Sequence, residues 1–249
     1  MNLPHLARSD SSKPLGTEFA SNDAGMQYTP IFSNRTDAGK ALARDLVRHA
    51  DRDDVIVLAL PRGGVPVAYE VAKKLRAQMD VFVVRKLGVP GHEEFGFGAI
   101  ASGGIRFVNE EVVRALKMPE AMVERIINRE QAELERREIS YRGNRPEPEI
   151  KGRIVIIVDD GLATGSTMRA AVTALRTRDP KLIIVAVPVA SEQACEDFKH
   201  EADVMAVCAV TPEPFYGVGM WYSDFSQTTD DEVRHLLNRA NASAMAGSE

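Results

Sequence analysis

The feature that most constrains the fold is an alternation of short apolar runs with segments of helical periodicity. The apolar runs lie at residues 55–60, 81–85, 153–158, 182–189 and 204–210. Helical spacing of apolar residues is found at 36–49, 65–78, 166–178 and 192–200. Continuous apolar runs are typical of strands buried on both faces, and strands that alternate with helices form parallel sheets with right-handed crossovers. The sequence therefore predicts an α/β fold, a three-layer domain around a parallel sheet.

Composition excludes several other classes of protein. The 249 residues are 44% hydrophobic with a net charge of −5, which is too apolar and too weakly charged for an intrinsically disordered chain. The absence of a basic excess argues against a nucleic-acid-binding protein. No uncharged apolar run reaches about 18 residues, so we expect no membrane span. Because the first residues lack the apolar core of a secretory signal, we expect a cytoplasmic protein.

The two ends of the chain differ from the part between them. Residues 1–25 are rich in Ser, Gly, Asp and Asn without periodicity, so we expect a flexible N-terminal arm there and a flexible tail at 241–249. Residues 26–240 are long enough for a single α/β domain. Two independent small domains would also fit this length, but the regular alternation favours one.

A helical insertion is expected within this domain at about residues 109–142. Its apolar residues form a narrow stripe on an otherwise charged helix: Val123, Ile127, Leu134 and Tyr141. This pattern favours a solvated helix packed on one side over a partner-binding surface. The preceding residues 88–104 are too rich in glycine to be regular throughout, with a short strand near 105–108. We expect residues 88–141 and the C-terminal segment to form a smaller lobe over the strand ends.

The most informative segment is IVIIVDDGLATGST, residues 154–167. A buried strand delivers Asp159 and Asp160 to its carboxyl end, the edge where parallel sheets bind ligands. The loop that follows opens into a helix and exposes backbone N–H groups, which favour a phosphate dianion. The acids would repel phosphate, so their partners are sugar hydroxyls or a hydrated divalent cation. A plain strand-to-helix turn is the alternative. A P-loop is disfavoured because the segment has no lysine.

This segment resembles the motif with which type I phosphoribosyltransferases bind 5-phosphoribosyl 1-pyrophosphate (PRPP). The resemblance implies a fold of that family, a parallel sheet with a smaller hood lobe. It implies that Asp159 and Asp160 hold the ribose hydroxyls and act in catalysis with Mg²⁺, and that a loop holds the 5′-phosphate. The residues of this loop are Ala163, Thr164, Gly165, Ser166 and Thr167. Enzymes acting on 6-oxopurines usually carry an acid where this chain has Ala163, which argues against hypoxanthine–guanine specificity.

A second segment supports the resemblance. Leu60-Pro61-Arg62-Gly63-Gly64 follows the first core strand, where the family places a pyrophosphate-binding loop that often contains a cis peptide. An arginine followed by two glycines offers a cation, accessible amides and backbone freedom. Arg62, Gly63 and Gly64 are therefore assigned to pyrophosphate, as is Arg85 at the next strand end. A solvated strand end is an equal alternative for Arg85.

The remaining predicted site residues lie in the lobe. The glycine-rich segment 91–104 stands where the family has a flexible loop that closes over the sugar, and His92 and Glu94 are its polar candidates. Lys86 and His92 are predicted to assist catalysis. The base is expected to lie against an aromatic ring after the last core strand, with Phe215 and Tyr216 first and Trp221 and Tyr222 nearby. Lobe packing is the alternative for each ring.

Taken together, the sequence predicts a Mg²⁺-dependent transferase that moves the phosphoribosyl group of PRPP to a small heterocyclic base and releases pyrophosphate. The family also implies a homodimer. A non-catalytic sensor of PRPP or a nucleotide on the same fold is the main alternative, and it would need neither the flexible loop nor the base pocket. Hydrolysis or phosphorolysis at a ribose-phosphate centre would use the same residues and stays open.

Overall fold

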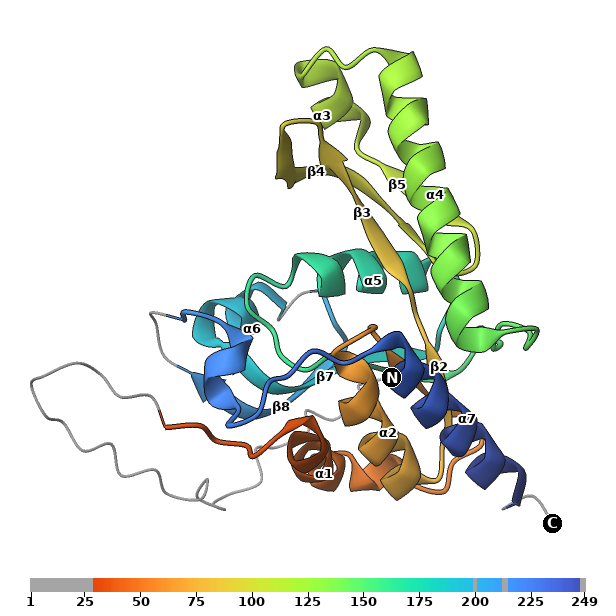
Figure 1. Cartoon of the computed structure of the whole chain (residues 1–249), viewed down its shortest axis with the longest axis vertical. Helices are drawn as coiled ribbons and strands as arrows, with labels where there is room; N and C mark the ends of the chain where they lie inside the picture. The colour runs from red at the N-terminus through yellow and green to blue at the C-terminus, as the bar shows by residue number, and fades with distance from the viewer. Residues whose placement is uncertain (1–28, 199–200, 212–214, 247–249) are drawn as a thin grey trace, which may run out of the picture.

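The computed structural model describes residues 29–198, 201–211 and 215–246 (Figure 1). Its main sheet is parallel, with the strand order β2-β1-β6-β7-β8. The strands are β1 (Val55–Ala59), β2 (Gln78–Val81), β6 (Ile154–Val158), β7 (Leu182–Ser191) and β8 (Val204–Thr211). Every residue of β1 and β6 is buried, as their apolar runs predict.

Helices cover both faces of this sheet. On one face, α2 (Gly64–Leu75) packs against β1, and α1 (Arg35–Asp45) packs against α2, β7 and β8. On the other face, α5 (Ser166–Arg176) and α6 (Glu192–Phe198) pack against β7, and α6 also packs against β8. A short 3-10 helix, η1 (Val47–His49), follows α1. The predicted three-layer α/β arrangement is confirmed (Figure 1).

A second lobe stands beside the sheet. It contains an antiparallel sheet of β3 (Val84–Val89), β4 (His92–Ala101) and β5 (Ile105–Val108), together with α3 (Glu110–Ala115) and α4 (Glu120–Arg142). We call this lobe the hood. Figure 1 shows its sheet above α5, with α4 running along its side. Within the described residues, no helix is long and apolar enough to cross a bilayer.

Two boundaries predicted from the sequence are wrong in this region. The run at 81–85 is divided between β2 of the main sheet and β3 of the hood, and α2 ends at Leu75 because Arg76 adopts a left-handed cap (φ 54°). The glycine-rich segment is mostly strand, but turns at residues 90–91 and 102–104 interrupt it, so it is not regular throughout, as expected. Its glycines allow close strand contact, since a Cβ on Gly98 would lie 2.3 Å from the carbonyl oxygen of Phe107.

The predicted helical insertion is interrupted between Leu116 and Pro119, where Pro119 has extended backbone angles and begins α4. The predicted apolar stripe of α4 is buried, including Leu134 at 1% exposure, while Ile139 on the opposite side is 69% exposed. One-sided packing of this helix is therefore confirmed. The stripe lies against β3 and β4 of the hood and against β2 of the main sheet.

The C-terminal segment joins the hood only in part, because it also packs on the main domain. Helix α7 (Asp230–Ala246) packs against α2, β2 and α4, and buries Val233 and Leu237 in the same cluster as β1. These two residues are one helical turn apart and form an apolar face that α2 covers. Residues 241–246 of the expected tail lie in this helix; residues 1–28 and 247–249 are outside the described part, so the arm stays a prediction.

Candidate functional site

The two motifs singled out in the sequence meet at the carboxyl ends of neighbouring strands. Ala59, the last residue of β1, pairs with Val158, the last residue of β6. The backbone after β1 passes directly over the acids, because a Cβ on Gly64 would lie 2.6 Å from the carbonyl oxygen of Val158 and 2.9 Å from Cα of Asp159. The peptide bond between Pro61 and Arg62 is cis. The PRGG loop and the acidic pair therefore form one continuous surface.

Asp159 and Asp160 are held differently. The backbone N–H of Asp160 donates to Oδ1 of Asp159 at 2.9 Å. Burial raises the pKa of Asp159 well above its usual range, and the neighbouring charge of Asp160 raises it further. Burial also raises the pKa of Asp160, although the Arg35 guanidinium opposes this shift. Two adjacent carboxylates with little water around them require a bound cation or hydrogen-bond donors when both are charged.

Helix α5 begins at the loop predicted to hold phosphate. Gly165 precedes its first residue with φ 69° and ψ 4°, and a Cβ there would lie 2.4 Å from the ring of Phe198. The loop is tied to the end of β7, since the Ser191 hydroxyl donates to the carbonyl of Ala163 at 3.1 Å. The hydroxyls of Thr164 and Ser166 lie 3.3 Å apart in an exposed position. The first N–H groups of the helix and these hydroxyls are thus available as donors for an anion.

Comparisons with known proteins agree with this geometry. The phosphoribosyl transferase domain family matches residues 97–217. TT1426 from Thermus thermophilus has a solved structure that is 40% identical, with a TM-score of 0.74 over 84% of this chain and 98% of that one. The chain belongs to the phosphoribosyltransferase family. MT0597 and Rv0571c of Mycobacterium tuberculosis, whose names assign them provisionally as phosphoribosyl transferases, are 44% identical over 211 residues, 85% of this chain. The chain spans about half (47%) of the length of these curated relatives.

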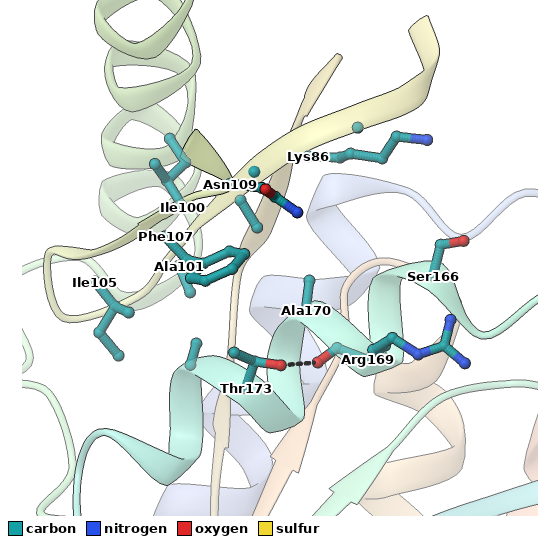
Figure 2. A pocket seen from close by; sticks show the side chains of 14 residues that line it. Lys86, Ile100, Ala101, Ile105, Phe107, Asn109, Ser166, Arg169, Ala170 and Thr173 are labelled. Atoms are coloured by element: carbon teal, nitrogen blue, oxygen red, sulfur yellow. Dashed lines mark hydrogen bonds between the residues drawn. The ribbon is translucent and has the colours of Figure 1, made fainter. Parts of the chain in front are cut away.

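The remaining predicted site residues are distributed around the two loops. Lys86 of β3 and Ser166 of α5 line the same cavity of about 300 Å³, which lies between the hood sheet and α5 (Figure 2). Its other walls are mainly apolar, including Phe107 and Ala170. Lys86 therefore lies on the face of the hood that is turned toward the phosphate loop.

Arg85 lies on the opposite face of β3, because neighbouring residues of a strand alternate in direction. Its Nε donates to the buried carboxylate of Glu130 on α4 at 2.9 Å. The other predicted pyrophosphate ligand, Arg62, lies 3.5 Å from Asp230, and Asp230 also accepts a hydrogen bond from the Tyr141 hydroxyl at 2.9 Å. Arg85 is thus engaged within the hood and Arg62 at the start of α7.

His92 lies at the tip of the β3–β4 hairpin, exposed and edge-on to Phe95 with ring centroids 6.3 Å apart. The side chain of Glu94 is outside the described residues. That this hairpin takes the place of the family's flexible loop and closes over a ligand stays a prediction.

The two candidate base-binding rings differ in exposure. Phe215 stacks on Trp221 with centroids 6.4 Å apart, and both pack near Phe32 and Tyr222. Tyr216 is 70% exposed. Pro212–Pro214 lie outside the described residues, and the base-binding role of both rings stays a prediction.

Sequence reasoning missed Arg35. This residue opens α1, and its Nε donates to Oδ2 of Asp160 at 2.8 Å. A lone arginine before a helix carries no signal in a single sequence, because 125 residues separate it from its partner.

Proposed function

We propose that the protein is a Mg²⁺-dependent phosphoribosyltransferase that transfers the 5-phosphoribosyl group of PRPP to a nitrogen base and releases pyrophosphate. The observation that carries this proposal is the convergence of the PRGG loop, the acidic pair and the α5 loop at adjacent strand ends. Membership of the phosphoribosyltransferase family supports it.

The three parts match the three polar parts of PRPP. The hydroxyls and N–H groups from Thr164 to Thr167 suit a terminal phosphate. The acids suit ribose hydroxyls, which donate hydrogen bonds to carboxylates. Arg62 and the amides after it suit the pyrophosphate, since guanidinium groups bind phosphate oxygens in a bidentate manner.

The donor set also fits Mg²⁺. This cation prefers carboxylate oxygens, keeps several waters and completes its shell with substrate phosphates. Within the described residues no cluster of three or more His, Cys, Asp or Glu could hold a metal by itself. Asp159 and Asp160 would therefore hold Mg²⁺ together with PRPP. When bound, Mg²⁺ supplies positive charge that stabilises the leaving pyrophosphate.

The protein's own residues mainly position and shield the reactants. The two loops fix both ends of PRPP, so that the anomeric carbon is presented in one orientation. The β3–β4 hairpin carries Lys86 and His92, and its closure would exclude water from the reacting centre. Phe215 and Tyr216 would contact the base. We also expect a homodimer in the cytoplasm, with sedimentation analysis as the test of the dimer.

The deciding experiment measures pyrophosphate release from PRPP and Mg²⁺ over a panel of nucleobases, preceded by calorimetry of PRPP binding. The variant D159N/D160N should lose turnover by about a thousandfold or more while its circular dichroism is unchanged. Asp54→Asn is the matched control, because Asp54 pairs with Arg52 before β1, at the opposite end of the strand. Wild-type activity in the double variant would refute the proposal, and PRPP binding without release for any base would support the sensor instead.

A further inference from the structure

Arg35 contacts three different parts of the site at once. Besides donating to Asp160, its Nη1 donates to the backbone carbonyl of Ser226 at 2.7 Å, and its guanidinium carbon lies 3.9 Å from the ring centroid of Phe225. The side chains of Arg35 and Asp160 are only 12% and 15% exposed. A lysine could not make this set of contacts, because only the planar guanidinium both forks and stacks.

Arg35 is positioned by α1, and α1 packs on α2, the helix that starts at the PRGG loop. The Asn34 side chain caps α1 by accepting from the N–H of Asp37 at 3.0 Å. Helix α1 packs tightly on α2, since a Cβ on Gly39 would lie 2.7 Å from the carbonyl oxygen of Val67. Because α2 begins at Gly64, the loop, α2, α1 and Arg35 form one packed unit.

The segment beyond β8 is anchored at the same point. The Tyr222 hydroxyl donates to the backbone carbonyl of Asp160, and Phe225 packs on Tyr222 with centroids 5.1 Å apart. Backbone N–H groups of Ser223 and Asp224 donate to the carbonyls of Phe32 and Ser33, just before α1. Arg35 therefore joins the acidic pair to the chain that carries the predicted base-binding rings.

We propose that Arg35 is a positioning residue that fixes the Asp160 carboxylate between the PRGG loop and residues 221–226. This inference rests on the proposed PRPP-binding function. Arg35 occupies Oδ2 of Asp160, the oxygen that also lies against Gly63. Without Arg35, the adjacent carboxylates of Asp159 and Asp160 lose the guanidinium group that pairs with Asp160.

The test measures PRPP affinity of the full chain in the presence of Mg²⁺ by calorimetry. Arg35→Met should raise the dissociation constant about tenfold or more, and Arg35→Lys less, because lysine keeps the charge but not the fork. Arg176→Met is the control, since Arg176 pairs with Asp203 at the other end of α5 and should leave affinity unchanged. If the Met variant fails to fold in thermal melts, the Lys variant decides.

A double-mutant cycle separates positioning from direct ligand contact. In an Asp160→Asn background, Arg35→Met should raise the dissociation constant of PRPP less than about threefold, because the carboxylate through which Arg35 acts is already gone. Equal losses in both backgrounds would overturn the proposal and make Arg35 a direct ligand contact. In Arg35→Ala, millimolar guanidinium should restore affinity for PRPP and urea should not. Rescue by urea, which is uncharged, would show that Arg35 acts only by filling space.

Failures of the two proposals can be told apart. If the wild-type chain does not bind PRPP, the proposed function fails and the role of Arg35 fails with it. If the wild-type chain binds PRPP and Arg35→Met binds equally well, only the role of Arg35 is refuted.

Discussion

A Cβ atom on Gly63 would lie 2.0 Å from Oδ2 of Asp160, closer than any non-bonded contact allows. Gly63 has φ −59° and ψ −35°, angles that every residue adopts easily. Glycine is therefore needed here for space rather than for backbone freedom. The PRGG loop and the acidic pair cannot both keep their places once any side chain is added.

Gly63→Ala should thus displace the Asp160 carboxylate and reduce PRPP affinity about tenfold or more, at a cost in stability of about 1–3 kcal/mol. Calorimetry with PRPP and Mg²⁺, together with thermal unfolding, checks both effects. Gly143→Ala is the control, because Gly143 has φ 62° and nothing within 4 Å of its Cβ position. That variant should lose stability without losing affinity. Unchanged affinity in Gly63→Ala would contradict the close packing.

Gly165→Ala combines two penalties in the loop before α5, a left-handed φ and a contact of 2.4 Å with the Phe198 ring. It should destabilise the fold by about 2–4 kcal/mol and weaken binding of the phosphate group. Gly152→Ala is the matched control, since Gly152 has φ 70° and open space around it. The difference between the two variants in chemical denaturation isolates the contact with Phe198. Equal destabilisation would show that this ring moves aside freely.

Asp159 should make the ligand-free protein less stable at neutral pH than at acidic pH. Because burial raises its pKa in the folded state, the folded chain binds the proton more tightly than the unfolded chain. Its contribution to the free energy of unfolding is present below the unfolded pKa, about 3.9, and is lost as pH rises through the higher folded pKa.

Asp159→Asn removes this penalty, so at pH 7 it should raise the free energy of unfolding by about 1 kcal/mol, about 2–4 °C in Tm. The gain should shrink as pH falls, because protonated aspartic acid and asparagine have similar shapes. Thermal melts of both proteins across pH, without ligand, measure the difference. A variant less stable than wild type at pH 7 would refute this account.

Leu134 lies on the buried side of α4 and Ile139 on its exposed side. Leu134→Ala should destabilise the protein by about 2–5 kcal/mol, because the side chain is 1% exposed and leaves a cavity. Ile139→Ala should stay within about 0.5 kcal/mol, since that side chain is 69% exposed. Urea denaturation of both variants measures these values. A large loss at Ile139 would instead indicate that a partner covers this side of the helix in solution.

Much of the site follows from the sequence because parallel strands end at one edge of a sheet. Asp159 and Asp160 stand directly after β6, and Arg62 to Gly64 stand shortly after β1, so the adjacency of the motifs needed only the correct strand assignment. The buried stripe of α4 could also be predicted from the sequence, because helical periodicity indicates which side of a helix is packed. The strand boundaries near residue 81 could not be predicted, because one apolar run is divided between strands of two different sheets.

The sequence by itself determined the layered α/β fold, the acidic pair, the glycines beside it and the start of α5, because each is encoded by residues close together in the chain. Only the tertiary structure decided that Arg35 meets Asp160, that Arg85 turns to Glu130, and that α7 packs on both α2 and α4. These contacts join residues far apart in sequence. Their partners are selected by how the helices pack, and no local pattern records that choice.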